Sequence, residues 1–444
     1  MALTGMQIYK LLPKTNCKDC GLPTCMAFAM QVAAKQKALT DCPHVSEESK
    51  SELSEASSPP MRLVKIGSGD ATFEIGQETV MFRHDEKFHR PCGIAVRVSA
   101  KLSDDEAMKV VEKINGSVFD RVGQTLKVEL CALEVDGTGD PAGRAKKAAE
   151  KSNVPLILVG KDAGAVGAAA ESIKDSRPLL YGADASNIDA FIDVAASSKC
   201  PLAISAGSLE ELADLTSKAK EKGVEDLVLS FDSKDMVQTL RSLTIARRAA
   251  LRKNFRPLGY PALVEVIEGD AIDETVVTAA FAAKYAGIVI IENAEPWELL
   301  PIMVVVQNIY TDPQVPNTVD AKLYEIGDVN ENSPVLFTTN FSLTYFSVEA
   351  EVERSKIPTY ICVVETEGLG VLNAYAGDKI SAEKVVKTVQ EQKIAEKVKH
   401  RKFIIPGLLP IFRAEIEDTS EWKEVIIGPE TAREIPGFLT NNWK

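Results

Sequence analysis

The stretch GIAVRVSAKLSDDEAMKVVEKI, residues 93–114, contains the pattern that decides the fold of most of this chain. It opens on an apolar strand candidate, and Ser103 then stands where a helix N-cap belongs, before an acidic first turn. The same order of strand and helix recurs along the chain. Further strand candidates lie at residues 126–135, 155–160, 178–182, 201–206, 226–231, 262–267 and 287–293. Eight such units predict a (β/α)8 barrel, since an open doubly wound sheet rarely holds so many.

Two further serines mark expected helix starts within this repeat. Ser186 precedes NIDAFIDVAAS, and Ser208 precedes LEELADLTSKAKEKG with Glu211 at the capping-box position. In a barrel, the active face is built from the loops that follow the strands. We expect these loops at residues 136–140, 161–164, 205–208, 232 and 292–297. Their acidic residues form no constellation that indicates a reaction and are better explained as helix caps.

The segments before the barrel have a different composition. Residues 61–90 hold two short extended runs, RLVKIG and ETVMFR, which predict a hairpin leading into the barrel. Residues 46–60, SEESKSELSEASSPP, are rich in Ser and Glu and end in two prolines. Such a segment cannot bury enough apolar surface to fold alone, so it predicts a linker. The chain is thereby divided into residues 1–58, 59–322 and 323–444.

The last of these parts alternates again between strands and helices. Its strand candidates are SPVLFTTN (333–340), TYICVVE (359–365), FIIP (403–406) and EVIIGP (424–429). Residues 381–398 predict an amphipathic helix capped by Ser381. This order predicts a compact α/β domain with three layers.

Two turns of this α/β domain are distinctive, TTNFSLTYF (338–346) and ETEGLGVLNAYAGDK (365–379). Both follow strands, and ligands of open α/β sheets lie outside the carboxyl ends of the strands. Gly368 and Gly370 would let the backbone come close to a flat or phosphate-bearing ligand. A tight turn without any ligand explains these two glycines equally well.

Four of the eight cysteines lie close together near the N-terminus, at Cys17, Cys20, Cys25 and Cys42. Three of these thiols stand within one short loop and the fourth stands alone. Zinc ribbons usually present two separated pairs of ligands. Three thiolates on one loop and a distant fourth suit the corners of a [4Fe–4S] cluster better. We therefore predict such a cluster, with a structural zinc site as the alternative.

The surroundings of these cysteines support a metal-binding loop. Gly21 permits an unusual backbone dihedral, and the neighbouring prolines stiffen the turns. Residues 25–39 predict an Ala-rich helix that leads the chain back to the fourth ligand. His44 is expected to lie at the surface rather than to bind metal, because four thiols complete the set. The remaining cysteines are scattered, and Cys131 and Cys362 are expected to be buried and inert.

Composition sets the broad class of the protein. A chain of 444 residues is too long for one ordinary core, so two or three domains are expected. The net charge of −13 disfavours nucleic acid as a partner. The N-terminus lacks the features of a secretory signal, and no apolar run is long enough to span a membrane. We expect a cytoplasmic protein, in which clustered thiols stay reduced and bind metal.

Taken together, the chain resembles the large (gamma) subunit of the corrinoid iron–sulfur proteins of the reductive acetyl-CoA pathway, and the related subunit of acetyl-CoA decarbonylase/synthase complexes. The resemblance extends over essentially the whole chain. Its motifs are YKLLPKTNCKDCGLPTCMAFA (9–29) with Cys42, FTTNFSLTYFSVEAEVERSKIP (337–358), ETEGLGVLNAYAGDK (365–379) and REIPGF (433–438). The first motif is highly specific and the others are supportive.

The resemblance implies a methyl-group carrier, usually classed with methyltransferases rather than a self-sufficient enzyme. The four cysteines would hold the [4Fe–4S] cluster, the barrel would pair with a smaller barrel subunit, and a Rossmann-like C-terminal domain would hold a cobamide. The cobalt would accept a methyl group from methyl-tetrahydrofolate, or from a methyl-tetrahydropterin, through a separate methyltransferase. It would pass the methyl group to acetyl-CoA synthase/CO dehydrogenase. The cluster, supplied by a donor such as ferredoxin, would reduce Co(II) to Co(I).

The resemblance also implies the cobamide contacts, carried over motif by motif. They are Thr338, Thr339, Thr344, Gly368, Leu369, Gly370, Val371, Arg433, Ile435 and Pro436. Many corrinoid proteins place a histidine under cobalt through an Asp-x-His-x-x-Gly motif. The histidines His44, His84, His89 and His400 do not stand in such a motif. The cobamide is therefore expected without a histidine ligand, in the base-off form. The alternative hypothesis is a pterin-dependent methyltransferase built on the barrel, with the cluster as an appended electron-transfer module.

Overall fold

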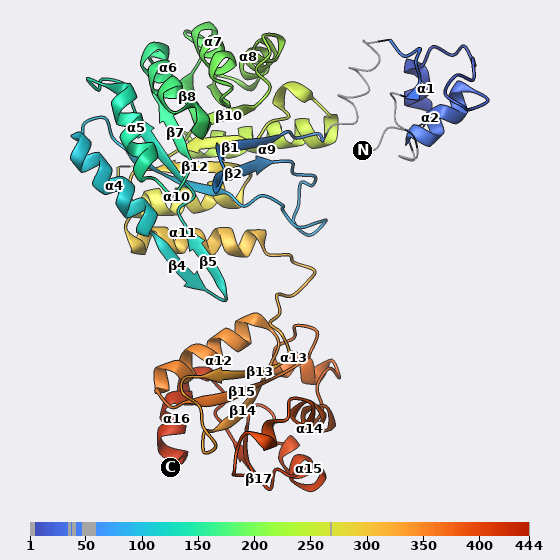
Figure 1. Cartoon of the computed structure of the whole chain (residues 1–444), viewed down its shortest axis with the longest axis vertical. Helices are drawn as coiled ribbons and strands as arrows, with labels where there is room; N and C mark the ends of the chain where they lie inside the picture. Colours follow the sequence, from blue (N-terminus) through green and yellow to red (C-terminus); the bar gives the residue numbers. More distant parts are fainter. Residues whose placement is uncertain (1–4, 34–36, 38–40, 47–58, 267–268, 444) are drawn as a thin grey trace.

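The computed structural model describes residues 5–33, 37, 41–46, 59–266 and 269–443. Figure 1 shows three parts in chain order: two short helices, a barrel, and a mixed sheet with helices around it. The predicted linker falls for the most part on residues 47–58, outside the described residues. The end of the predicted helix over residues 25–39 also lies outside them, beyond Ala33 and apart from Lys37.

The largest part is a closed barrel of eight parallel strands, as the repeat predicts. Each strand candidate of the repeat contributes one strand, and the strands pair in chain order around the barrel. The strands are β3 (Gly93–Val98), β6 (Leu130–Glu134), β7 (Leu156–Val159), β8 (Leu179–Ala183), β9 (Leu202–Ser205), β10 (Leu227–Asp232), β11 (Ala262–Glu265) and β12 (Ala286–Ile291). The pairing of β12 with β3 closes the ring.

Helices follow the barrel strands and surround them (Figure 1). They are α4 (Asp104–Gly116), α5 (Pro141–Lys151), α6 (Ala163–Ser172), α7 (Ile188–Ser198), α8 (Leu209–Glu221), α9 (Met236–Lys253), α10 (Ala271–Ala283) and α11 (Pro296–Tyr310). Ser103 makes the full capping box with Glu106, and Ser208 accepts from the Glu211 amide. The expectation for Ser186 is wrong, since α7 begins after Asn187 and the Ser186 side chain turns back to Asp184.

Short hairpins flank the barrel strands and correct two expectations. β1 (Leu63–Ser68) pairs with β2 (Ala71–Gly76), so the run ETVMFR at residues 78–83 is not the second strand. Gly69 takes a left-handed conformation with φ +58° and reverses the chain directly after β1. The residues that pair with β1 are therefore those that follow immediately, Ala71–Gly76, and not residues 78–83. The long run at residues 126–135 is also divided. Its start belongs to β5 (Gln124–Lys127), which pairs antiparallel with β4 (Val118–Arg121) outside the barrel.

The C-terminal part contains a sheet in the order β13-β15-β14-β16-β17. Its parallel strands match the four candidates: β14 (Val335–Thr339), β15 (Thr359–Val364), β16 (Lys402–Ile405) and β17 (Glu424–Ile427). The antiparallel edge strand β13 (Leu323–Ile326) was not expected. The chain passes from β14 to β15 on one side and then crosses to β16 on the other side of β14. The strand order reverses there, so the space between the ends of β14 and β16 is a topological switch point.

Helices cover both faces of this sheet, so the three-layer prediction is confirmed. One core joins the sheet to α12 (Ser342–Ser355) and α16 (Ile435–Asn442). The other joins it to α14 (Ala382–Glu391) and α15 (Phe412–Thr419). The short α13 (Val371–Ala376) follows β15. Ser381 caps α14, but the helix ends well before residue 398, because Lys393 takes a left-handed conformation.

The N-terminal part is built on α1 (Gly5–Leu11) and α2 (Cys25–Ala33), which pack around a small apolar cluster containing Ile8, Leu12 and Phe28. A core of this size gives little stability on its own. In the described part of the chain, we find no helix with the length and apolar character needed to cross a membrane.

Candidate functional site

The four clustered cysteines lie on one loop, one helix start and one turn of the N-terminal part. Cys17 is exposed and Cys20 is half-buried, while Cys25 begins α2 and is buried with Cys42. Cys25 and Cys42 belong to the small apolar cluster, and Cys20 packs against it. The small core thus holds the segments of Cys20, Cys25 and Cys42, while Cys17 lies on the exposed part of the loop.

The loop that carries the first two thiols has an unusual backbone. Lys14, Asn16 and Lys18 have φ values of 58°, 49° and 70°, and Gly21 has φ +80° as expected. Left-handed residues that alternate with ordinary ones turn successive amide groups toward one side, which makes a concave site for an anion. Non-glycine residues adopt this conformation at a cost of order 1 kcal/mol or more each, so the surrounding contacts must impose it.

Three polar side chains hold this loop and the start of α2 in place. The Asn16 side-chain oxygen accepts from the Cys25 amide at 2.8 Å, which ties the start of α2 to the loop. Thr24 accepts from the Ala27 amide at 3.1 Å and caps the same helix. The Lys37 ammonium donates to the Cys20 carbonyl at 3.2 Å. The loop is thus held by the start of α2 and by Lys37, which follows that helix in the chain.

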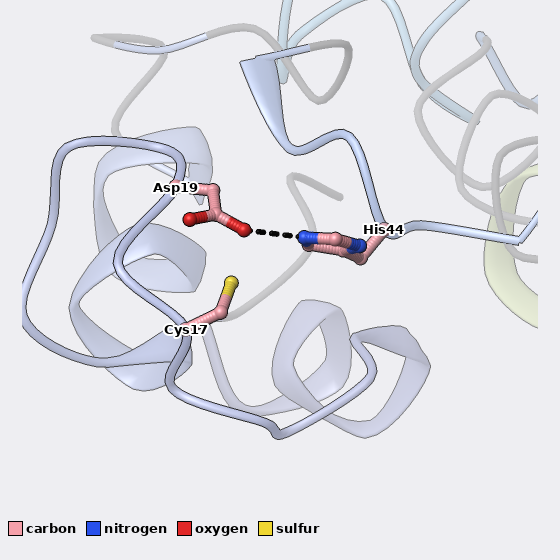
Figure 2. A group of neighbouring side chains, drawn as sticks. All are labelled: Cys17, Asp19 and His44. Atoms are coloured by element: carbon pink, nitrogen blue, oxygen red, sulfur yellow. Dashed lines mark hydrogen bonds and ion pairs between the residues drawn. The ribbon is translucent and has the colours of Figure 1, made fainter.

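His44 approaches this loop from the fourth cysteine. Figure 2 shows its ring directed at the Asp19 carboxylate, with the Cys17 thiol beside them. The His44 Nε2 atom lies 2.5 Å from Asp19 Oδ2, and one donor atom from each of the three residues lies within 4.8 Å of the others. The hydrogen bond from His44, and then that from Cys17, lowers the pKa of Asp19. This contact joins the segment of Cys17 to the segment of Cys42.

Among the described residues, the four thiols are not drawn together as the ligands of a single zinc ion would be. Within the described residues, Cys17, Asp19 and His44 form the one trio of donors gathered within 4.8 Å, and no trio of thiols is as close. A tetrahedral zinc ion would hold its four sulfurs about 3.8 Å apart. A larger cluster would spread the thiols more widely than a zinc ion does.

A second candidate site is a cavity of about 300 Å³ at the switch point of the C-terminal sheet. Thr338 at the end of β14 and Pro406 after β16 lie on its two sides. The side chains around it are mainly apolar, from β14, α12, β16, the loop after β17 and α16. The carboxyl ends of diverging strands are where open α/β sheets bind their ligands.

Four of the ten predicted contacts line this cavity: Thr338, Thr344, Val371 and Ile435. The other six do not: Thr339, Gly368, Leu369, Gly370, Arg433 and Pro436. Thr339 follows Thr338 on the strand, so its side chain points to the opposite face of the sheet. Its hydroxyl is buried and finds no hydrogen-bond partner in the described part of the chain.

The two glycines of the second turn have different roles. Gly368 has φ +72°, and a Cβ there would lie 2.7 Å from Pro316 Cβ, so the turn requires glycine. Gly370 has an ordinary φ of −68°. A Cβ at Gly370 would lie 3.4 Å from the Thr344 hydroxyl, a normal contact. Neither the backbone dihedral nor the neighbouring atoms therefore require glycine at position 370.

The sequence of the chain matches the family described as CO dehydrogenase/acetyl-CoA synthase delta subunit over residues 63–439, and that described as putative Fe-S cluster over residues 12–44. It is 42% identical to the corrinoid/iron–sulfur protein large subunit of Moorella thermoacetica, covering 100% of this chain and 99% of the relative. It is 37% identical to the acetyl-CoA decarbonylase/synthase complex subunit gamma of Methanopyrus kandleri, covering 98% and 97%. With the gamma subunit of Methanothermobacter thermautotrophicus, the identity is 34% and the coverage is 99% of each chain.

The chain belongs to the family of corrinoid/iron–sulfur protein large subunits and acetyl-CoA decarbonylase/synthase gamma subunits. The relatives show that the chain is of the large (gamma) type and not of the delta type. Large and gamma subunits match it from end to end, including the cysteine segment. The match to the delta-subunit description begins only at residue 63, after that segment. The family resemblance drawn from the motifs is thus confirmed.

For this family member, the structure adds a residue that the motifs did not single out. Asn340, which follows β14, is 1% exposed. Its side-chain oxygen accepts from the Thr366 amide and hydroxyl at 2.9 Å and from the Gly368 amide at 3.1 Å. Its amide nitrogen donates to Glu365 at 2.8 Å. One buried side chain therefore holds the first turn of the candidate site against the second.

Two turns of the cavity were also missed. Residues 406–408 after β16 and residues 428–432 after β17 contribute to its lining. A signal was present, since FIIP and EVIIGP both end at a proline beyond a strand, the place where a parallel sheet exposes its ligand edge. The cysteines outside the cluster, Cys92, Cys131, Cys200 and Cys362, are all buried, as expected for Cys131 and Cys362.

Proposed function

We propose that this protein is a methyl-group carrier whose C-terminal sheet holds a corrinoid and whose N-terminal loop holds a [4Fe–4S] cluster. The bound corrinoid would supply a cobalt that accepts and releases a methyl group, and the cluster would supply low-potential electrons that keep the cobalt reactive. The observation that carries this proposal is the cavity at the switch point. Each of the three motifs of the C-terminal part contributes to its wall, through Thr338, Val371 and Ile435 respectively.

For the cluster, the chain's own residues would act as ligands and as a shell. Cys17, Cys20, Cys25 and Cys42 would hold the iron, as their spacing predicts. Amides of the loop at residues 14–21 would donate hydrogen bonds to its sulfurs. Such bonds stabilise the reduced form of the cluster, which carries more negative charge. Asn16 would keep Cys25 and the loop in register through its contact with the Cys25 amide.

For the corrinoid, the cavity would exclude water from one part of the cofactor. A volume of about 300 Å³ is too small to enclose a whole corrinoid, so the rest would lie over the rim. Leu372, Tyr375 and Ile411 are exposed apolar side chains beyond the carboxyl ends of the strands. Together with Leu343, they offer an apolar surface that a second protein would need to cover.

The absence of a histidine from the cavity wall supports the base-off form within the described residues. His400 precedes β16, where its ring contacts Ser333 and Trp443. His84 and His89 pair with Asp85 and Glu86 near the barrel. His44 lies beside Asp19 in the N-terminal part, so all four histidines have contacts away from the wall of this cavity.

The proposal also includes the partners that the family resemblance implies. The small subunit would cover the exposed rim of the corrinoid site and form the heterodimer. A methyl-tetrahydrofolate or methyl-tetrahydropterin methyltransferase would deliver the methyl group, and acetyl-CoA synthase/CO dehydrogenase would receive it. A ferredoxin-like donor would reduce the cluster in the cytoplasm. The boundaries at residues 58 and 322 remain part of this proposal.

The test is to measure iron and cobalt per chain in protein purified without oxygen together with the small subunit. We expect roughly four iron atoms and one cobalt atom for each chain. Cys20→Ala should lower the iron content and change the cluster signal, while cobalt stays at the parental ratio, since the two sites lie on separate parts of the chain.

The matched control is Cys200→Ser. Cys200 is a buried thiol of the barrel whose sulfur donates to the Ser198 carbonyl, so serine can replace it with little change. This variant should keep both metals. A full [4Fe–4S] signal in Cys20→Ala would contradict the ligand assignment, and parental protein without cobalt would contradict the carrier function.

A further inference from the structure

The mouth of the barrel contains a cavity of about 900 Å³. It lies at the carboxyl ends of the strands, with walls from the loops after β6, β7, β9 and β10, from the end of β8 and from the start of α9. This is the end at which barrels of this type bind their ligands. The carrier function proposed for the C-terminal sheet makes no use of this cavity.

The floor of the cavity is a layer of charged side chains at the ends of the strands. Arg97 of β3 donates to Glu134 of β6 at 2.6 Å and to Glu265 of β11. Its Nε atom lies 2.9 Å from Glu292, which follows β12. The side chains of Arg97, Glu134 and Glu265 are only 12%, 24% and 20% exposed. Below them, the inward residues of the same strands are apolar, such as Ala95, Ala132 and Leu263.

The charges on this floor do not balance. Three carboxylates surround one guanidinium, which leaves two negative charges without a partner when all three are ionised. The lysines on the rim do not compensate, because Lys161 pairs with Asp184 and Lys234 lies beside Asp232. Burial, together with the like charges of Glu134, Glu274 and Glu265, raises the pKa of Glu292 despite the opposing effect of Arg97. Excess negative charge in a partly buried place is costly unless a cation joins it.

A buried hydroxyl at the same depth also lacks a partner. Ser230 of β10 is 2% exposed and lines the cavity, and its oxygen makes no hydrogen bond of normal geometry among the described residues. The neighbouring Tyr181 hydroxyl donates to Glu265 instead. Ser230 lies near enough to this phenol to oppose the rise in the Tyr181 pKa that burial and Glu265 cause, although the two hydroxyls do not reach normal hydrogen-bond geometry. An unsatisfied buried hydroxyl costs about 1–3 kcal/mol, so it points to a missing polar partner.

A purely structural role for this layer explains less. A charged layer that only sealed the barrel would be expected to pair its charges and its hydroxyl internally, because the barrel interior below it is apolar and closed. Here, an excess of negative charge and a hydroxyl without a well-formed hydrogen bond lie beside a space of small-molecule size. The same excess charge excludes phosphate esters and other anions from the site.

We propose that the mouth of the barrel binds a small organic cation that carries amino or amidino groups. Its charged nitrogens would donate to Glu134 and Glu265, which line the cavity and already accept from Arg97, and to the half-exposed Glu292 next to them. Ser230 would gain a hydrogen bond to the same ligand. Binding here is independent of the corrinoid and the cluster, so the proposal stands or falls separately from the carrier function.

The test uses agmatine, which carries a guanidinium and an ammonium group, in calorimetric titration of the full-length protein at low salt. Its anionic counterpart, 4-guanidinobutanoate, keeps the guanidinium but ends in a carboxylate. We expect agmatine to bind with a stoichiometry of one and 4-guanidinobutanoate to bind at least about tenfold more weakly.

Three variants locate the site. Glu292→Gln should weaken agmatine binding by about tenfold, because it removes one negative charge near the floor. Ser230→Ala should weaken it by about three- to tenfold without any change of charge. Asp189→Asn is the control, since Asp189 pairs with Lys218 and Lys222 outside the barrel, and its affinity for agmatine should be that of the parent.

Unfolding midpoints of all variants, measured in parallel, show whether the fold is kept. Three results would overturn the proposal: no agmatine binding at millimolar concentration, equal binding of 4-guanidinobutanoate, or parental affinity in both Ser230→Ala and Glu292→Gln. An equal loss of affinity in Asp189→Asn would indicate attraction to the acidic surface as a whole and would count against the site as well.

Discussion

The mouth of the barrel and the switch point of the C-terminal sheet are the same kind of place with opposite chemistry. Both lie at the carboxyl ends of parallel strands, where loops and helix starts surround a hollow. The barrel mouth is lined by Arg97 and a surplus of carboxylates, whereas the switch-point cavity is lined mainly by apolar side chains. The topology provides the hollow, and the side chains at the strand ends decide what it binds.

The largest effect is expected from filling each hollow with the same side chain. Ser347 of α12 lines the switch-point cavity, and Ser242 of α9 lines the barrel mouth. Ser347→Trp should reduce bound cobalt at least tenfold, because the indole would occupy the space of the cofactor. Ser242→Trp should leave cobalt unchanged and abolish agmatine binding.

Cobalt content and agmatine titration of both variants, with iron as the internal reference, provide the measurement. If Ser242→Trp lost cobalt to the same extent as Ser347→Trp, the two hollows would not act independently. Loss of iron along with cobalt would indicate general misfolding instead of a blocked site.

A smaller effect is expected from loosening the loops that shape the two hollows. Asn340 holds the turns of the C-terminal site through four hydrogen bonds. Asn187 holds the loop after β8 at the barrel mouth, with bonds to Asp184, Lys161 and Gly182. Asn340→Ala should destabilise the protein by about 3 kcal/mol, since it leaves the buried amides of Thr366 and Gly368 without an acceptor.

The asparagine comparison is made by urea unfolding and by cobalt content. Asn340→Ala should lose cobalt several-fold, whereas Asn187→Ala should cost about 1 kcal/mol, because its loop is more exposed, and should keep cobalt. Parental cobalt in Asn340→Ala would mean that the turn at residues 365–370 does not contact the cofactor.

The smallest effect concerns the pH dependence that the charged mouth alone should show. Burial would raise the pKa of Asp184, but hydrogen bonds from Lys161 and Ser186 outweigh it and lower the pKa to about 2. Since the unfolded carboxyl titrates near 3.9, the stabilisation is complete above about pH 4 and is lost as the pH falls toward 2. Asp184→Asn should therefore cost about 1 kcal/mol at pH 7, with a smaller cost below pH 4.

The pH effect is measured as the difference in unfolding free energy between parent and Asp184→Asn from pH 7 to pH 3. A difference that stays constant over this range would show that the Lys161–Asp184 pair contributes nothing through its charge. The switch-point cavity has no comparable charged pair on its wall in the described structure, so Ser347→Ala should change stability by a constant amount over the same range.

Local sequence determined much of this protein. The eight apolar runs predicted eight barrel strands, because burial on both faces of a strand leaves a continuous apolar signature in the chain. Ser103 and Ser208 predicted their helix starts correctly, since an N-cap involves only four consecutive residues. The capping box is complete at Ser103 alone, because Glu211 accepts from the Gly207 amide instead. The spacing of Cys17, Cys20 and Cys25 similarly indicated a chelating loop, because three ligands on nine residues are already neighbours before folding.

Only the tertiary structure decided which distant residues became partners. Arg97 and Glu265 are 168 residues apart, and they meet because the closed barrel brings β3 and β11 into one layer. Asn340 and Gly368 meet because β14 and β15 end side by side in a parallel sheet. Strand alternation indicates that a residue points inward, but not whose side chain it faces there. That pairing follows from the closure and order of the strands, which long-range packing of the whole chain selects and no local window contains.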